Sequence, residues 1–473
     1  MDPPKKRQKR HTETTLLPIH PLRIKPSGNA LLAKTNARPG GLGYMNTIPD
    51  ELLLDILAHL EARHLQLLGA CSKALYAFTR FDELWKTLTV EEKPAHVKQQ
   101  WRGTWRRTYL QLPEEKTARF SVPHLYSDVL YRPYFCSQVD VCQFMKHNAN
   151  TIARLPNMTL DEFHHQWTNT PFILTEPVSQ WPAYEKQWDL KKLAEEYAEV
   201  EFRAECVDWP MKTYLQYTEN NVDESPLYLF DRDFERKTKL KEEYILPDVF
   251  TEDYFAVLGD ERPDHRWLIA GPQSSGSTFH KDPNSTSAWN AVLTGKKYWI
   301  IFPPDQLPPG VYVSEDQAEV TSPVSLAEWL TGFHREARRE AGCLEGICEA
   351  GEIIHVPSQW WHLVINLTPS VALTGNFIAK NNLRKALRFM RDMPDQVSGF
   401  RKVEDPYALF VKRMEQEHPI ELKNALEEME WEDEAKRKKV EAKASSGWTS
   451  LTENIGGFSF GFGGDDEGLE DEE

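Results

Sequence analysis

Hydrophobic and polar positions divide the chain into regions with different periods. Between residues 48 and 90, apolar residues recur at the i, i+3 and i+4 spacing of one helical face, which predicts a small helical bundle. From about 120 to 392, short apolar runs separated by Gly and Pro predict a closed β-barrel or β-sandwich with intervening helices. After residue 380, three amphipathic or charged segments predict further helices, at 382–390, 407–414 and 422–442.

These changes of period predict an α+β multidomain chain. Its parts are a disordered basic tail (1–46), a helical bundle (47–92), a mixed domain with an N-terminal helical region (93–392), C-terminal helices (393–443) and a disordered acidic tail (444–473). Neither tail has hydrophobic periodicity, because the first is rich in Pro, Gly, Ser and Thr and the second in Gly, Phe and acidic residues. We therefore expect neither tail to build a core.

The helical bundle has more apolar positions than a segment of its size can bury. Pro49 and Asp50 stand where its first helix would begin. The apolar positions that follow are Leu52, Leu53, Ile56, Leu57, Leu60, Leu65, Leu67, Leu68, Cys71, Leu75 and Phe78. Such an excess is typical of a docking surface.

In the mixed domain, one segment is predicted as a helix and several short ones as strands. The helix is 189–200, and the strands are 227–230, 267–270, 287–293, 297–302, 352–356, 362–366 and 370–374. Many short strands with Gly and Pro between them favour a barrel in which opposite walls supply the side chains of one site.

Composition excludes several classes of protein. With 40% hydrophobic and 27% charged residues, the chain is neither fibrous nor wholly disordered. No apolar run approaches the roughly 20 residues of a membrane span, and the first residues lack the apolar stretch of a secretory signal, so we expect an intracellular protein. The six cysteines are scattered without the spacing of a zinc site, and we expect them to be reduced.

Charge indicates the kind of partner. The 56 Lys and Arg residues against 72 Asp and Glu give a net charge of −16, which opposes general binding to nucleic-acid phosphates and favours basic protein partners. The run Lys5-Lys6-Arg7-Gln8-Lys9-Arg10 favours nuclear import over a merely solubilising tail. We expect the protein in the nucleus, with the cytoplasm as a second location.

One pattern carries candidate metal chemistry. His280 and Asp282 are two residues apart, so on a strand both side chains would project from the same face. His362 follows on a separate strand-like segment and would complete two histidines and one carboxylate. This facial set leaves positions open on an Fe(II) ion for a co-substrate and O2.

Two other histidines compete for this role. His334 and Glu336 have ligand spacing, but they lie in a predicted helix, where residues two apart point in different directions. His355 lies seven residues before His362 and before the Pro357 turn, so it would not share a ligand position with it. We expect His362 to be the distal ligand.

Residues 48–60, with Leu67-Leu68-Gly69-Ala70-Cys71 and Leu84-Trp85, resemble an F-box. The resemblance covers about 45 residues and implies docking on a Skp-type adaptor of a cullin ubiquitin ligase. A purely intramolecular helical bundle is the alternative.

Residues 271–302 and 351–376 resemble the JmjC family of Fe(II)/2-oxoglutarate oxygenases. The matching motifs are Gly271-Pro272, Gly276, His280-Lys281-Asp282-Pro283, Thr286 to Ala291, Gly295 to Lys297, Gly351-Glu352, Val356-Pro357, Trp360-Trp361-His362 and Asn366 to Asn376, with Ser225 to Asp231 upstream. The closest branch is that of nuclear lysyl hydroxylases and arginine demethylases, the phosphatidylserine-receptor-like proteins. The resemblance implies a double-stranded β-helix barrel with flanking helices.

The resemblance also implies roles for residues. His280, Asp282 and His362 would bind Fe(II) and carry catalysis. Lys297, in preference to Lys296, would pair with the distal carboxylate of 2-oxoglutarate, because a buried carboxylate needs a countercharge. Further co-substrate contacts are implied for Tyr228, Thr278, Asn290 and Thr374, and the hydroxyl assigned to Thr278 could instead belong to Ser277.

The sequence therefore predicts an enzyme, a dioxygenase that uses Fe(II), 2-oxoglutarate and O2. It would hydroxylate lysine or demethylate methyl-arginine or methyl-lysine in basic nuclear proteins, and its F-box would link it to a cullin ubiquitin ligase. The alternative is a substrate adaptor of that ligase whose barrel acts mainly as a binding module. In the resembling branch, C-terminal helices pair two catalytic domains, so a homodimer and helices packed on their own barrel are both open.

Overall fold

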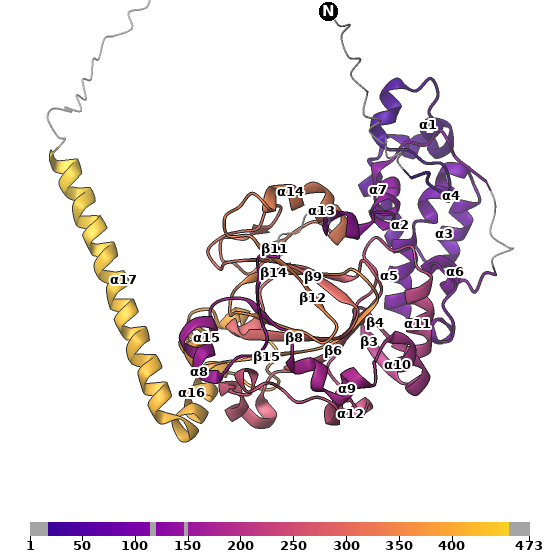
Figure 1. Ribbon diagram of the computed structural model, residues 1–473. Coiled ribbons are helices and arrows are strands. Elements are labelled where there is room, and N and C mark those ends of the chain that lie inside the picture. Colours follow the sequence, from indigo (N-terminus) through magenta and orange to yellow (C-terminus); the bar gives the residue numbers. More distant parts are fainter. Residues whose placement is uncertain (1–17, 114–119, 146–149, 454–473) are drawn as a thin grey trace, which may run out of the picture.

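The computed structural model describes residues 18–113, 120–145 and 150–453. It has three parts: a helical bundle, a barrel, and C-terminal helices on the side of the barrel away from the bundle (Figure 1). No helix in these ranges is both long and apolar enough to span a membrane.

The bundle starts earlier in the chain than its hydrophobic period predicts. Its elements are η1 (Ser27–Leu32), α1 (Ala37–Leu42), η2 (Gly43–Thr47), α2 (Asp50–Ala58), α3 (Ala62–Gly69), α4 (Lys73–Thr79) and α5 (Asp82–Glu92). Leu22 and Ile24 are buried, and Lys25 forms a β-bridge with Tyr126. The prediction of a disordered tail through residue 46 is therefore wrong from residue 18 onward, because a few apolar side chains fix this segment against later parts of the chain.

The bundle is joined to the mixed domain by buried contacts. Asp82, at the start of α5, accepts hydrogen bonds from the backbone N–H groups of Trp105 and Arg106 at 2.9 Å each. Trp105 begins α6 (Trp105–Tyr109) and packs on Trp209, with ring centroids 5.4 Å apart. One hydrophobic core thus extends from Leu53 of the bundle through these tryptophans into the main sheet. The bundle and the mixed domain therefore share one packed core.

Two sheets form the barrel. In spatial order, the nine-stranded sheet is β1 (Ala153–Leu155), β2 (Phe172–Leu174), β13 (Ile353–Val356), β8 (Ser287–Thr294), β15 (Ser370–Phe377), β6 (Arg266–Gly271), β5 (Leu229–Asp231), β3 (Glu201–Ala204) and β4 (Val207–Pro210). The four-stranded sheet is β12 (Leu344–Glu349), β9 (Lys296–Phe302), β14 (Trp361–Asn366) and β7 (Gly276–His280). A separate ribbon pairs β10 (Tyr312–Val313) with β11 (Val320–Thr321).

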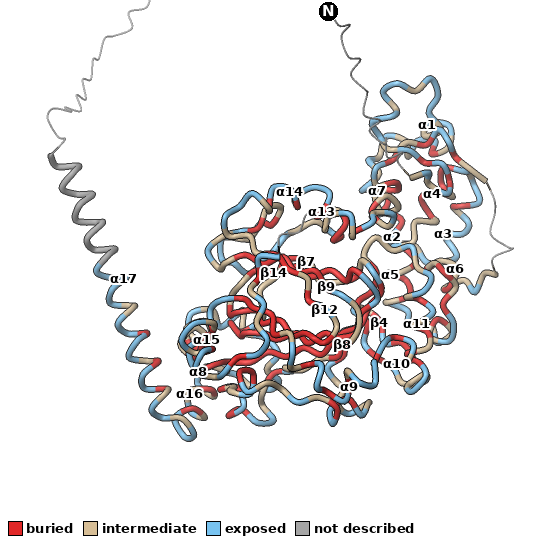
Figure 2. The backbone as a smooth tube through the Cα atoms, in the orientation of Figure 1, coloured by how far each residue is buried: buried red, intermediate tan, exposed pale blue. Residues whose placement is uncertain are grey.

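The barrel interior is a packed core with contributions from both sheets. Val292 and Ile354 of the larger sheet meet Trp299 and Val364 of the smaller one. The strand walls are almost continuously buried (Figure 2), as expected for strands covered on both faces. The prediction of an α+β chain with a double-stranded β-helix barrel is confirmed, and the predicted strands lie within three residues of β5, β6, β8, β9, β13, β14 and β15.

The remaining helices surround the barrel. They are α7 (Asp128–Ser137), α8 (Leu160–Glu162), α9 (Pro182–Glu185), α10 (Leu190–Glu196), α11 (Met211–Glu219), α12 (Phe234–Lys237), α13 (Leu326–Gly332), α14 (His334–Ala337), α15 (Leu383–Asp392), α16 (Pro406–Glu417) and α17 (Pro419–Glu453). The prediction of a disordered acidic tail from residue 444 is wrong for residues 444–453, because the backbone of α17 stays helical through Glu453. Residues 454–473 lie outside the described ranges, as does the basic run of residues 5–10.

Candidate active site

The three predicted metal-ligand side chains meet at one end of the smaller sheet. His280 ends β7 and lies opposite His362 of β14 in the ladder, with ring centroids 4.1 Å apart. Asp282 Oδ2 is 4.0 Å from His362 Nε2. One ligand atom from each of the three lies within 4.8 Å of the others, as in a metal site.

The local backbone differs from the sequence prediction in one respect. Strand β7 stops at His280, so Asp282 does not share its strand face. It lies in extended backbone just before the turn Pro283–Ser285. The chain leaves the strand here, and the turn brings the carboxylate beside the two imidazoles.

Hydrogen bonds fix the tautomers of both imidazoles. His280 Nδ1 is 2.7 Å from the carbonyl oxygen of Thr278, and His362 Nδ1 is 3.1 Å from that of Trp360. Since a carbonyl oxygen only accepts, both Nδ1 atoms carry the proton and donate it, which leaves the Nε2 lone pairs free. Backbone carbonyls of this kind commonly orient histidine ligands.

The surroundings of this cluster fit a divalent cation. Oδ2 of Asp282 is buried and has no hydrogen-bond partner among the described residues. Burial raises the pKa of Asp282, and burial together with the nearby His280 lowers the pKa of His362 well below its usual value. Two imidazoles whose Nδ1 atoms face backbone carbonyls, and a carboxylate with one unsatisfied oxygen, are a donor set that an Fe(II) ion would complete.

A second polar centre lies deeper in the barrel, at Lys297 on β9. Its side chain is fully buried, and its Nζ donates to the hydroxyl of Tyr228, which precedes β5. No carboxylate in the described ranges pairs with this ammonium, and burial lowers the pKa of Lys297 to about 7. Lys296, the alternative, is exposed and pairs with Glu349 at 2.9 Å. A buried ammonium with only neutral partners is suited to bind an anion such as a carboxylate.

Two further predicted residues, Asn290 and Thr374, lie on neighbouring strands of the larger sheet. Asn290 of β8 lies opposite Thr374 of β15, and Asn290 Oδ1 is buried without a partner in the described part of the chain. The Thr374 hydroxyl donates to the carbonyl oxygen of Trp289 at 2.6 Å, so its proton is already engaged.

Strand register distinguishes Thr278 from Ser277. A register shift between β7 and β14 places Ser277, not Thr278, opposite Val364, whose side chain packs inside the barrel. Both residues line a cavity of about 450 Å³ that also contains His280. The ladder therefore favours Ser277 as the hydroxyl that faces inward.

Two polar residues near the site were not singled out from the sequence. Asn366 of β14 pairs in register with Lys297, and its Oδ1 is buried without a partner among the described residues. Trp299 Nε1 is likewise buried without a hydrogen-bond partner among the described residues. The ring centroid of Trp299 is 6.1 Å from that of His362. Strand alternation could have identified both residues. Trp299 is two residues after Lys297 and Asn366 is four after His362, so each shares a strand face with a predicted site residue.

The competing histidines lie elsewhere, as predicted. His334 is on α14, with its Nε2 3.0 Å from the hydroxyl of Tyr298. His355 is fully buried on β13 and packs on Phe172 on the outer side of the sheet, with ring centroids 4.9 Å apart. Neither belongs to the group of three potential metal ligands.

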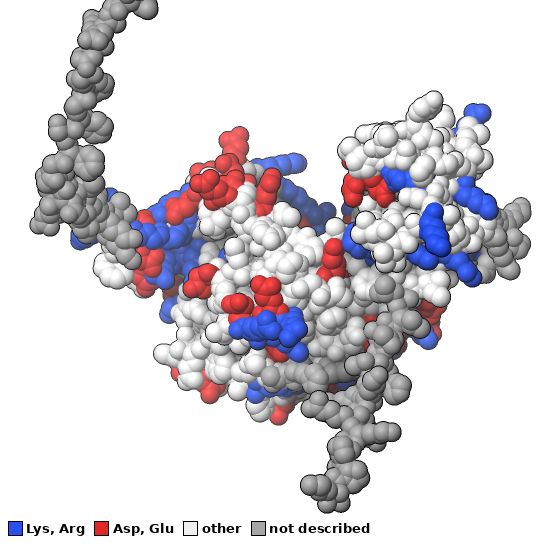
Figure 3. All heavy atoms as spheres, turned by 90° about the horizontal axis from the view of Figure 1, so that it is seen from above, with Lys and Arg blue, Asp and Glu red and all other residues white. Residues whose placement is uncertain are grey.

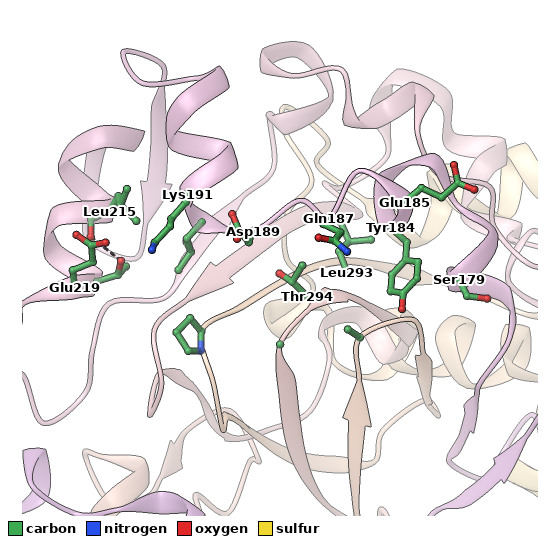
Figure 4. A pocket seen from close by; sticks show the side chains of 15 residues that line it. Ser179, Tyr184, Glu185, Gln187, Asp189, Lys191, Leu215, Glu219, Leu293 and Thr294 are labelled. Carbon is green, nitrogen blue, oxygen red and sulfur yellow. Dashed lines mark hydrogen bonds between the residues drawn. The ribbon is translucent and has the colours of Figure 1, made fainter.

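A larger hollow of about 660 Å³ lies away from this chemistry. It is formed by the chain around α9 and α10, the end of β8 and the Thr294-Gly295 turn (Figure 4). None of the predicted site residues lines it. The cavity at His280 is therefore the candidate entrance to the site.

Comparisons with known proteins agree with this geometry. A cupin-like domain family matches residues 210–383, and an F-box-like family matches residues 45–91. The arginine-specific demethylase JMJ22 of Arabidopsis thaliana is 39% identical over 453 residues, which cover 92% of this chain and 88% of that protein.

Two other relatives match the catalytic part of the chain. The bifunctional arginine demethylase and lysyl-hydroxylase psr-1 of Caenorhabditis elegans is 34% identical over 280 residues, 56% of this chain and 67% of the relative. The 2-oxoglutarate and iron-dependent oxygenase JMJD4 of Danio rerio is 28% identical over 287 residues, 55% of this chain and 63% of the relative. The chain belongs to the JmjC family of dioxygenases that depend on Fe(II), 2-oxoglutarate and O2, and it carries an F-box domain ahead of the catalytic barrel.

Proposed function

We propose that His280, Asp282 and His362 hold the Fe(II) ion and that 2-oxoglutarate binds between this ion and Lys297. The observation that carries the proposal is the buried ammonium of Lys297, whose one hydrogen-bond partner among the described residues is a phenol, in the same barrel as two imidazoles with free Nε2 atoms. When bound, the ion together with 2-oxoglutarate and O2 supplies the oxidation of a substrate C–H bond, with succinate and CO2 as co-products.

The residues of the chain hold and orient the co-substrate in this proposal. Lys297 provides the countercharge for its distal carboxylate, and the Tyr228 hydroxyl donates a second hydrogen bond to it. Asn290 and either Ser277 or Thr278 contact the co-substrate from the neighbouring walls, and Thr374 shapes the pocket beside Asn290. The packed interior around Trp299 and Val364 excludes bulk water.

We propose protein side chains as the substrate. Hydroxylation of lysine in nuclear proteins is the first candidate, and demethylation of methyl-arginine or methyl-lysine is the second, because the relatives are named for arginine demethylation and lysyl hydroxylation. The test is succinate release by purified protein with Fe(II), 2-oxoglutarate and basic peptides. His280→Ala and Asp282→Ala should abolish it, and undiminished turnover would overturn the metal assignment.

A second function, as a ubiquitin-ligase adaptor, is favoured by the surface of the bundle. Leu52, Ile56 and Leu67 are 54%, 50% and 58% exposed, whereas Leu53 and Leu57 are buried. Because residues 52 and 56 lie one helical turn apart, α2 presents an apolar strip to solvent. We propose that this strip docks on a Skp-type adaptor of a cullin ligase, so that the chain acts as both enzyme and adaptor.

Location and assembly are further proposals. We propose a nuclear location, with the cytoplasm second, on the basis of the Lys5–Arg10 run. Fusion of residues 1–17 to a fluorescent reporter tests import. In the described chain α15 and α17 pack on each other, with Arg388 and Asp433 at 2.6 Å. A homodimer through these helices stays a prediction, which sedimentation of the full chain tests.

A further inference from the structure

The cavity that contains His280 does not end at the barrel. It shares Ser225 and Val324 with a second hollow of about 550 Å³ between the F-box helices and the mixed domain. Seen from above, the surface is notched between the barrel and the helical bundle, and both acidic and basic side chains are exposed beside the notch (Figure 3). One groove therefore leads from the metal site to the F-box.

Charge is distributed unevenly along this groove. The lining near His280 has one carboxylate, that of Glu205, and no Lys or Arg. Glu205 is exposed at the tip of the β3–β4 hairpin, and its Oε1 accepts a hydrogen bond from the backbone N–H of Tyr228 at 3.0 Å. The carboxylate of Glu205 thus lies at the entrance of the cavity that contains His280. It is hydrogen-bonded to the backbone of Tyr228, whose hydroxyl contacts Lys297.

The F-box supplies the other end of the groove. Asp82, Glu83 and Lys86 of α5 line the second hollow. Lys86 lies 3.6 Å from Glu83 and over the ring of Trp105. Although residue Glu205 is exposed overall, burial by the protein atoms around it raises the pKa of its carboxyl, and the charge of Lys86 acts in the opposite direction, so the hairpin and α5 are within electrostatic reach.

We propose that Glu205 binds the cationic side chain of the protein substrate and that the groove from Ser225 to helix α5 binds the residues beside it. This inference rests on the proposed protein substrate and deepens it. Lysine and methyl-arginine both keep a positive charge, so one carboxylate serves either reaction. The F-box is then part of the substrate site. Its face toward the groove, on α5, differs from the exposed strip on α2, so an adaptor and a substrate can bind together.

The test compares the binding of two short peptides to the full-length protein with Fe(II) and 2-oxoglutarate under anaerobic conditions. One peptide is rich in lysine, and the other has norleucine at each lysine position. Glu205→Gln keeps the Oε1 acceptor for Tyr228 and removes the charge. We expect it to raise the Kd of the lysine peptide about tenfold and to leave that of the norleucine peptide unchanged.

Two further variants complete the design. Lys86→Gln removes the cation of the second hollow whose charge acts on Glu205, whereas Arg80 and Arg132 of that hollow stay, and it should tighten the lysine peptide about threefold. Glu199→Gln is the matched control, because Glu199 is exposed and pairs with Lys212 outside both hollows, and it should change nothing. Equal binding of the two peptides by wild type, or an unchanged Kd in Glu205→Gln, overturns the inference. Failure of wild type to bind Fe(II) and 2-oxoglutarate overturns the proposed function instead.

Discussion

Lys297 and Tyr228 form a buried pair inside the barrel, in which the ammonium donates to the phenol. Lys297 lies on β9 of the smaller sheet and Tyr228 just before β5 of the larger one, 69 residues apart in the sequence. The phenol is neutral, because burial raises its pKa further above the usual value, so it does not compensate the charge of the ammonium. The buried ammonium therefore destabilises the protein without 2-oxoglutarate, and it stabilises a carboxylate that binds beside it.

Lys297→Met should separate these two effects. Removal of an uncompensated buried charge should raise the melting temperature of the metal-free protein by a few degrees, whereas the affinity for 2-oxoglutarate should fall about a hundredfold. Thermal melts and calorimetric titration measure the two quantities. Lys296→Met is the matched control, since Lys296 is exposed, and it should change neither. Wild-type affinity in Lys297→Met would refute the assignment of the countercharge.

Binding of 2-oxoglutarate should depend on pH through the same lysine. Burial lowers the pKa of Lys297 to about 7 in the free protein, and a bound carboxylate would raise it again. Above pH 7 the amine must therefore take up a proton on binding, so the affinity should fall as pH rises. Burial raises the pKa values of Tyr228 and Cys348, which leaves both protonated in this range.

The measurement for this pH effect is calorimetry at pH 8 in buffers with different ionisation enthalpies. At pH 8 an amine with a pKa of about 7 is mostly neutral, so we expect most of one proton to be taken up for each molecule bound, and Lys297→Met should abolish the uptake. The lowered pKa of Lys297 also determines how the stability of the free protein changes with pH. Between pH 7 and the usual pKa of 10.5 the unfolded lysine binds more protons than the folded one, so this group makes the free protein more stable as pH rises. Binding without proton uptake would contradict the account.

The inward-facing hydroxyl can be identified by paired substitutions. The ladder places Ser277 opposite Val364 on the interior side, so Ser277→Ala should weaken 2-oxoglutarate binding about fivefold. Thr278→Val should have little effect, because only the backbone carbonyl of Thr278 contacts His280. The reverse order in a titration of both variants would reassign the contact to Thr278.

The exposed strip of α2 allows a test of the adaptor role that does not depend on folding. Leu52→Asp should abolish co-purification with a Skp-type adaptor and leave the melting temperature within a degree or two, because Leu52 is 54% exposed. The buried neighbour gives the contrast. Leu53→Ala should destabilise the bundle by about 2–5 kcal/mol. If the Leu52 variant still forms the complex, another surface binds the adaptor.

Sequence patterns predicted the barrel and singled out three side chains that the structure brings together, because each depends on local signals. Alternating strands with Gly and Pro turns identified most of the walls, and the motifs around His280 and His362 identified the three side chains that meet at one end of the smaller sheet. The position of Asp282 after the strand, and the choice between Ser277 and Thr278, depend on where a strand ends and where its ladder shifts. Pairing with the distant strand β14 determines both where β7 ends and where its register shifts, so the local sequence pattern does not show either feature.

The ordered segment before the F-box was missed for a similar reason. Leu22 and Ile24 stand in a stretch without hydrophobic period, and their contacts come from residues about a hundred positions later, near Val122 and Leu125. Asn366 and Trp299 were also overlooked, although strand alternation places them beside predicted residues. The unexpected groove between the barrel and α5 arises from the packing of two domains, which a single sequence does not display.

The central claim is that His280, Asp282 and His362 form an Fe(II) site open to 2-oxoglutarate. The most direct measurement is anaerobic titration of the purified protein with Fe(II) and 2-oxoglutarate, monitored by the weak visible charge-transfer band of the ternary complex, in wild type and in Asp282→Ala. We predict a saturable band in wild type and none in the variant. A band of equal strength in both, or none in metal-loaded wild type, would contradict the claim.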